Sequence, residues 1–119
     1  MYKIYKKFEF ASAHKLEGHV KCGKLHGHSY LCEVTVSCGY LSEDFGFVLD
    51  FNFFSEIKKE YDHTDKIITI SSEQLAEEIG MKILNKIKKE RDDNDFNDDD
   101  VEISVKIWES SSSYAEYTV

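Results

Sequence analysis

The chain has 119 residues, of which 41% are hydrophobic and 32% charged, and its formal net charge is −8. This size predicts one globular domain over residues 1–119 with a core of modest size, so we expect another copy of the chain to cover an exposed apolar face. Six negative charges come from the segment 92–100, DDNDFNDDD, and the rest carries only −2, which argues against a nucleic-acid-binding protein. We interpret the acidic segment as a solvated loop and assign it no function.

The cysteines and the N-terminus bear on the cellular compartment. Cys22, Cys32 and Cys38 cannot all pair with one another, and no N-terminal apolar segment has the character of a signal peptide or a membrane span. We therefore expect a cytoplasmic protein that does not act at membranes. Cys32 and Cys38 follow the alternation of segment 29–38, which is typical of small buried hydrophobic residues, whereas Cys22 lies outside any such pattern.

Alternating and helical patterns predict six elements in chain order. Segments 2–10 and 29–38 alternate as strands, and a turn around residues 43–46 returns the chain toward a short amphipathic helix within 49–63, with Asp50 as its N-cap. A second helix begins at Ser71, which has capping-box spacing to Gln74, and runs to about Ile87. Segment 101–108 and the residues after 109 alternate as two further strands. This ββααββ order predicts an α+β fold with a four-stranded antiparallel sheet and two helices on one face.

Three histidines are placed where a metal could be held. His26 and His28, in CGKLHGHSY (22–30), point to the same side of a strand, with Gly27 leaving room between them. His14 ends the first strand and joins them if the two strands are neighbours. Three imidazoles with one open position match a catalytic zinc site. Cys22 as a fourth ligand would close a structural zinc site instead, and the spacing leaves this alternative open.

Other titratable residues lie farther along the chain. Asp62 and His63 end the first helix, and consecutive helical residues do not face each other, so the pair is more typical of a helix terminus than of a proton relay. Glu109, where the strand 101–108 ends, is by itself more typical of an exposed charge at a strand end.

Five segments together identify a family. FEFASAHKL, CGKLHGHSY, YDHTD, SSEQLAEEI and IWESS resemble, in this order and over nearly the whole chain, the 6-pyruvoyl-tetrahydropterin synthase and 6-carboxy-tetrahydropterin synthase family. The resemblance implies the tunnelling fold, in which the sheets of several copies join into a barrel, commonly as a pair of trimers forming a hexamer, with active sites between subunits. The resemblance implies that His14, His26 and His28 bind zinc and that Cys22 is the catalytic base. It also implies that Asp62 and His63 assist proton transfer, that Glu109 anchors the pterin, and that Ser71 and Ser72 supply hydroxyls to the substrate.

The resemblance also implies a reaction. The substrate would be the small pterin 7,8-dihydroneopterin triphosphate, and the favoured product is 6-carboxy-5,6,7,8-tetrahydropterin, released with acetaldehyde and triphosphate on the way to queuosine and other 7-deazaguanine nucleosides. Two alternatives stay open: a 6-pyruvoyl-tetrahydropterin synthase that eliminates triphosphate only, and a non-catalytic pterin-binding zinc protein. The sequence departs from the family pattern in the loop ITISSEQ, where relatives often carry proline and threonine, and it has no proline at all.

Overall fold

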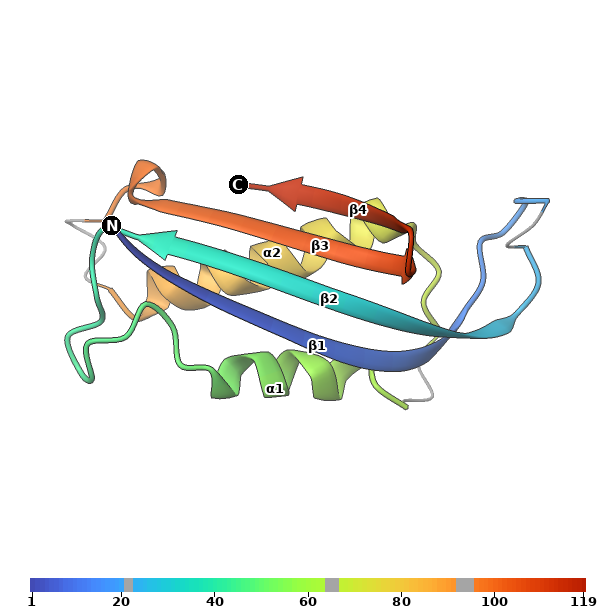
Figure 1. Cartoon of the computed structure of the whole chain (residues 1–119), viewed down its shortest axis with the longest axis horizontal. Coiled ribbons are helices and arrows are strands. Elements are labelled where there is room, and N and C mark those ends of the chain that lie inside the picture. Colours follow the sequence, from blue (N-terminus) through green and yellow to red (C-terminus); the bar gives the residue numbers. More distant parts are fainter. Residues whose placement is uncertain (21–22, 64–66, 92–95) are drawn as a thin grey trace.

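The computed structural model describes residues 1–20, 23–63, 67–91 and 96–119, and its strands form one antiparallel sheet in the order β1-β2-β3-β4 (Figure 1). The strands are β1 (Tyr2–His14), β2 (His26–Cys38), β3 (Val101–Ser110) and β4 (Ser113–Thr118). The helices are α1 (Asn52–Tyr61) and α2 (Ser72–Lys89), and a short 3-10 helix, η1 (Asp98–Asp100), precedes β3. The predicted α+β class and ββααββ order are confirmed.

Strands β1 and β2 form a long hairpin that is paired from Tyr2↔Cys38 to His14↔His26. Both are longer than the sequence predicts, because the alternation of inward and outward residues continues past residue 10. Ser12 and His14 are buried on the same side as Phe10. The hairpin therefore carries its histidines to the end of the sheet, beside the loop that projects beyond the helices (Figure 1).

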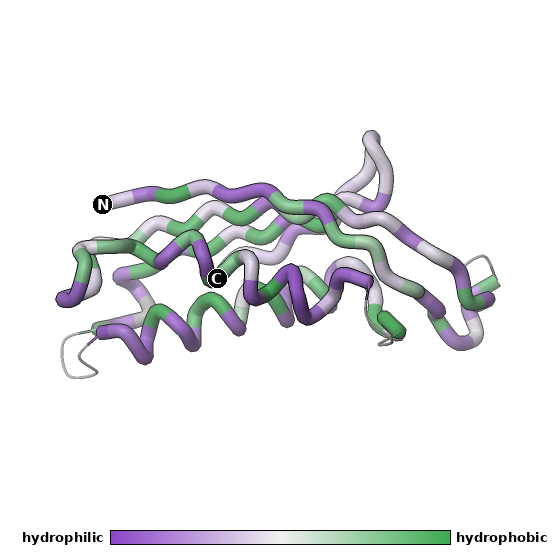
Figure 2. Tube along the Cα trace, turned by 90° about the horizontal axis from the view of Figure 1, so that it is seen from below, coloured by the Kyte–Doolittle hydropathy of each residue, from purple (hydrophilic) through white to green (hydrophobic). Residues whose placement is uncertain are grey.

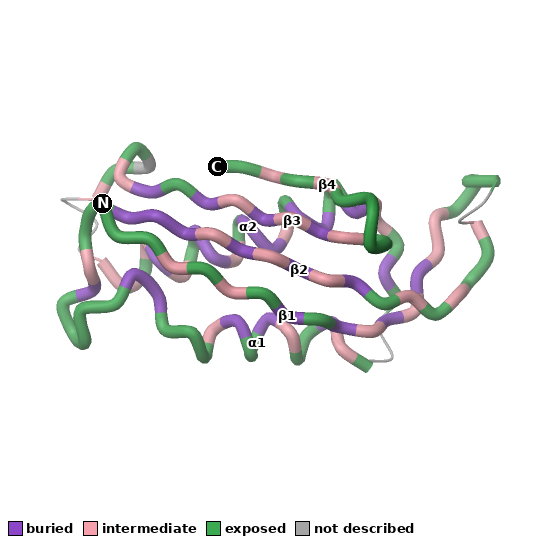
Figure 3. The backbone as a smooth tube through the Cα atoms, in the orientation of Figure 1, coloured by how far each residue is buried: buried purple, intermediate pink, exposed green. Residues whose placement is uncertain are grey.

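Both helices pack against the same face of the sheet, α1 under β1 and α2 under β3 and β4 (Figure 2). The inward side chains of the central strands are buried while their neighbours are more exposed, which gives the alternating colours along the strands in Figure 3. Cys32 and Cys38 are fully buried in this core, as their alternation predicts. In the part of the chain that the structure describes, no helix covers the opposite face of the sheet (Figure 2).

The two helix starts differ from each other. Helix α2 has the predicted capping box, in which the Ser71 hydroxyl accepts from the Gln74 backbone N–H and the Gln74 side chain accepts from the Ser71 N–H. The predicted N-cap of α1 is wrong by one residue. Phe51 already has helical backbone angles (φ −58°, ψ −24°) and occupies the N-cap, so Asp50 lies one position earlier. The Asp50 carboxylate still accepts from the Asn52 N–H at 2.9 Å.

The edge strands are β1 and β4. Residues 63 and 68 pair with the end of β1 through hydrogen bonds from the His63 N–H to the Ala11 carbonyl and from the Ile68 N–H to the Ala13 carbonyl, each 2.8 Å. Of the described residues, His63 and Ile68 thus pair with the edge of β1 close to the histidines. Within the described ranges, no helix has the length and apolar character needed to cross a membrane.

Candidate functional site

The three predicted histidines meet at the end of the β1–β2 hairpin. His14 lies directly opposite His26 in the register, and His28 lies opposite Ser12 on the same face. The ring centroids are 5.1 Å apart for His14 and His26, 6.0 Å for His14 and His28, and 5.9 Å for His26 and His28. The structure thus brings together three imidazoles that are separated by up to 14 positions in the sequence.

The nitrogen atoms of these rings fit a metal ion in part. His14 Nδ1 and His26 Nε2 are 3.4 Å apart, and two nitrogens bound to one tetrahedral zinc at about 2.0–2.1 Å would lie about 3.3 Å apart. Among the described residues, the Nε2 atoms of His14 and His28 are buried without a hydrogen-bond partner, which is rare for buried polar atoms and indicates a missing partner. Because one imidazole gives a metal ion one nitrogen, His14 would bind through either Nδ1 or Nε2.

The ring of His28 lies too far from the other two rings to bind the same metal ion with them. Imidazoles on one tetrahedral zinc would have centroids about 5 Å apart. The ring of His28 is about 1 Å farther than this from each of the other two. Accordingly, in the part of the chain that the structure describes, no three His, Cys, Asp or Glu residues are already arranged to hold a metal. Cys22, the predicted base or fourth ligand, lies outside the described residues.

Protonation favours metal binding at His26 and His28. His26 Nδ1 lies 2.8 Å from the Lys24 carbonyl, which can only accept, so in the neutral ring Nδ1 carries the proton and Nε2 has the lone pair. Burial lowers the pKa of His28, the charges of His14 and His26 lower it further, and Glu109 opposes this shift. His28 is therefore held in the neutral form that a metal ligand requires.

Asp62 and His63 are hydrogen-bonded to Ala11 of β1, three residues before His14. The Ala11 N–H donates to Asp62 Oδ1 at 2.8 Å. His63 leaves the helix with a left-handed φ of 49°, and its Nε2 lies 3.6 Å from the same Asp62 oxygen. The pair lies at a helix terminus, as predicted, with Asp62 as the C-cap of α1. The two side chains nevertheless approach each other, because His63 is no longer helical. Its side chain is 79% exposed, so the structure orients the imidazole but leaves it in solvent.

Glu109 and Ser72 form the second part of the site. The Ser72 hydroxyl, at the first residue of α2, donates to the Glu109 carboxylate at the end of β3. Both residues line a small cavity of about 120 Å³. The hydroxyl of Ser71 is instead engaged in capping α2. Of the two predicted serines, the structure therefore places Ser72, and not Ser71, against the carboxylate.

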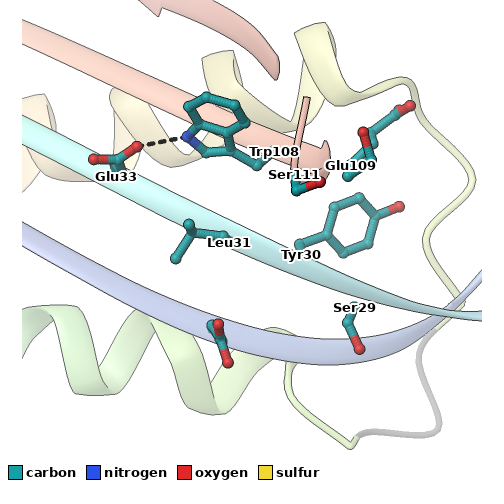
Figure 4. A pocket seen from close by; sticks show the side chains of 9 residues that line it. Ser29, Tyr30, Leu31, Glu33, Trp108, Glu109 and Ser111 are labelled. Atoms are coloured by element: carbon teal, nitrogen blue, oxygen red, sulfur yellow. Dashed lines mark hydrogen bonds between the residues drawn. The ribbon is translucent and has the colours of Figure 1, made fainter. Parts of the chain in front are cut away.

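A larger hollow of about 520 Å³ opens on the uncovered face of the sheet, where Leu31, Glu33 and Trp108 line it (Figure 4). The Trp108 indole N–H donates to Glu33 at 2.5 Å, and the Tyr5 hydroxyl donates to the same carboxylate. These donors, Tyr5 most strongly, lower the pKa of Glu33 against the opposing effect of burial. Sequence reasoning missed Tyr30, Trp108 and Glu33, although the first two flank the predicted site residues.

Comparison with known proteins identifies the family of the chain. The sequence profile of the family described as 6-pyruvoyl tetrahydropterin synthase matches residues 3–119. The chain belongs to this family. A Haemophilus influenzae relative named 6-carboxy-5,6,7,8-tetrahydropterin synthase is 30% identical, with 98% of this chain and 99% of the relative covered. A Rickettsia bellii relative of the same name is 32% identical over 70% of this chain and 60% of its own length.

Solved structures of 6-pyruvoyl tetrahydropterin synthases share the fold. The Caenorhabditis elegans enzyme matches with a TM-score of 0.63 at 21% identity, covering 99% of this chain and 95% of that one. The predicted family is thereby confirmed, and so is the predicted fold of the single chain, a four-stranded antiparallel sheet with two helices.

Proposed function

We propose that this chain is a zinc-dependent carbon–carbon lyase that converts 7,8-dihydroneopterin triphosphate and water to 6-carboxy-5,6,7,8-tetrahydropterin, acetaldehyde and triphosphate. The observation that carries the proposal is the convergence of His14, His26 and His28, two of which have buried, unpartnered Nε2 atoms. The family membership and the name of the Haemophilus influenzae relative support the pterin substrate. The product would feed the synthesis of 7-deazaguanine nucleosides such as queuosine.

His14, His26 and His28 would hold the metal. A zinc ion there would supply a Lewis acid that acidifies the hydroxyl groups of the substrate side chain. Three neutral imidazoles leave one coordination position for such a hydroxyl, and the donor set matches that of catalytic zinc. The lone pair that His26 keeps on Nε2 supports this assignment.

Glu109 would orient the pterin. A carboxylate can accept two parallel hydrogen bonds from the amino group and ring N–H of the heterocycle. The Ser72 hydroxyl bonded to Glu109 would fix the rotation of that carboxylate, and the electrostatic interaction of Glu109 with His28 supports this role. A pterin held at Glu109 would therefore present its side chain toward the histidines.

Cys22 and His63 would move the protons. A thiol near a metal ion or an imidazolium has a pKa well below its free value of about 8.5, so Cys22 could act as a base that removes a proton from side-chain carbon. His63, oriented by Asp62, would return a proton. The odd cysteine count supports a reducing compartment such as the cytoplasm.

Active sites shared between subunits would explain the exposure of His63. Both edges of the sheet, at β1 and β4, can add strands of further copies, as in the barrel that the family resemblance implies. We therefore propose a homo-oligomer of paired trimers. Mixing the inactive variants His14→Ala and His63→Ala should restore part of the activity if the two residues act from different copies. Failure to restore any activity in verified mixed oligomers would place both residues in one chain's site.

Product analysis tests the reaction. Zinc-loaded protein is incubated with 7,8-dihydroneopterin triphosphate, the pterin is identified by mass spectrometry, and acetaldehyde is measured separately. Carboxypterin with an equal amount of acetaldehyde is the expected result. A pyruvoyl product without acetaldehyde would identify the triphosphate-eliminating enzyme, and unchanged, bound substrate would identify a non-catalytic pterin-binding protein.

Two cysteine variants refine this test. Cys22→Ala should keep zinc and lose turnover, whereas loss of zinc would show that Cys22 is a metal ligand. Cys38→Ala, which removes a thiol that is fully buried in the core, is the matched control and should keep both properties.

A further inference from the structure

Tyr30 lies against the histidines on the inner side of the sheet. It is 2% exposed and follows His28 by two positions on the same face of β2. Its ring centroid is 4.4 Å from that of His28, and its ring meets the ring of His14 edge-on at 6.1 Å. One aromatic side chain thus contacts two of the three imidazoles.

Tyr30 is itself fixed by a series of aromatic rings that reaches helix α1. It stacks on Phe10, its cross-strand partner, with centroids 5.2 Å apart. Phe10 contacts Tyr61 at 5.5 Å, and Phe8 links Phe10 to the same helix, with centroids 6.2 Å from Phe10 and 6.5 Å from Phe54. Because packed interiors leave little free volume, Tyr30 cannot turn without displacing these neighbours.

The three histidines are oriented by different means. The Lys24 carbonyl fixes the tautomer and the rotation of His26 through a hydrogen bond. The Nε2 atoms of His14 and His28 have no hydrogen-bond partner, and both of these rings pack on Tyr30. His28 also has a hydrogen bond with the Glu109 backbone, and packing on Tyr30 adds a restraint that His14 and His28 share.

We propose that Tyr30 is a positioning residue that holds the rings of His14 and His28 so that their nitrogens converge on one metal ion. This inference rests on the proposed zinc site. It assigns Tyr30 no contact with zinc or substrate, and the ring rather than the hydroxyl carries the effect. Removing the ring should therefore weaken metal binding, and removing only the hydroxyl should not.

Zinc affinity measured by chelator competition on the folded protein tests this role. Tyr30→Leu should bind zinc 10–100-fold more weakly, which is the usual effect of losing a residue that orients metal ligands. Tyr30→Phe should stay within about threefold of the wild type, and its cobalt(II) form should keep the wild-type absorption spectrum, while that of Tyr30→Leu should change. If Tyr30→Leu does not fold, Tyr30→Met removes the same ring with a more adaptable side chain.

Phe8→Leu is the matched control, because it removes a ring of the same series that does not contact a histidine. It should lose stability but keep its zinc affinity and cobalt spectrum. Zinc binding by Tyr30→Leu or Tyr30→Met at the wild-type level, or equal weakening in Phe8→Leu, would overturn the positioning role. A wild-type protein that binds no zinc would refute the proposed function itself, before any variant is compared.

Discussion

Replacing His14 by leucine should have opposite effects on the metal-free and the zinc-loaded protein. His14 is 4% exposed, and its Nε2 is buried without a hydrogen-bond partner. Its Nδ1 lies 3.4 Å from His26 Nε2, which is long for a hydrogen bond between two rings. A residue kept for metal binding therefore costs stability when the metal is absent.

The magnitude follows from that unpaired nitrogen. Burying an unsatisfied polar group costs about 1–3 kcal/mol, and leucine has a similar size without any polar atom. We expect metal-free His14→Leu to be more stable than the wild type by about 1–2 kcal/mol. In a domain of this length, that corresponds to a rise in melting temperature of about 4–8 °C. Zinc at about 1,000 times its Kd should stabilise the wild type by about 4 kcal/mol and leave the variant unchanged.

Calorimetry after dialysis against a chelator, and again after zinc addition, measures both effects at one protein concentration. His19→Leu is the matched control, because it replaces an exposed histidine of the neighbouring loop. It should gain no stability without metal and keep the full effect of zinc. A loss of more than about 1 kcal/mol in metal-free His14→Leu would refute this reasoning, because His14 would then be a stabilising core residue.

Three further predictions concern the scaffold. A Cβ at Gly80 would lie 3.0 Å from the Tyr117 ring, so the Gly80→Val variant should have a free energy of unfolding in urea about 1–3 kcal/mol lower than the wild type. In Gly80→Ala, the gain in helix propensity of about 1 kcal/mol should offset most of the strain. Arg91→Met should lower the free energy of unfolding by about 2 kcal/mol in the same assay, because Arg91 Nη2 donates to three carbonyls of segment 40–48. An unchanged midpoint of urea unfolding would show that water replaces these hydrogen bonds. The folded-state pKa of Glu33 is lowered from its ordinary 4.5, so its contribution to stability is present above that pH and is lost as the pH falls through the lowered value. Glu33→Gln should therefore flatten this part of the stability–pH curve, and identical curves would contradict the assignment.

Local sequence patterns were sufficient to predict most elements of the fold. The alternation around Phe8 and Phe10 predicts β1, and the spacing of Ser71 and Gln74 predicts the start of α2, because each signal depends only on neighbouring residues. The start of α1 shows the limit of such signals. Asp50 has the right side chain for an N-cap, but the backbone of Phe51 had already turned helical. Propensity does not determine such a shift of one residue.

The site was predictable where it depends on strand pairing alone. The short spacing between His26 and His28, together with the end of a neighbouring strand at His14, was sufficient to predict that the three would meet. The contact between Tyr30 and the histidines requires the register that stacks it on Phe10, and the bond between Trp108 and Glu33 joins residues 75 positions apart. Neither has a local sequence signal, because a buried aromatic residue in a strand is typical of any core.

X-ray absorption at the zinc edge tests the central claim most directly. The account predicts a first shell of nitrogen and oxygen atoms at about 2.0–2.1 Å, with three imidazoles and one exchangeable light ligand that changes when a pterin with a hydroxylated side chain is added. A sulfur at about 2.3 Å that persists with the pterin bound would mean that Cys22 closes the site, and it would contradict the proposed chemistry.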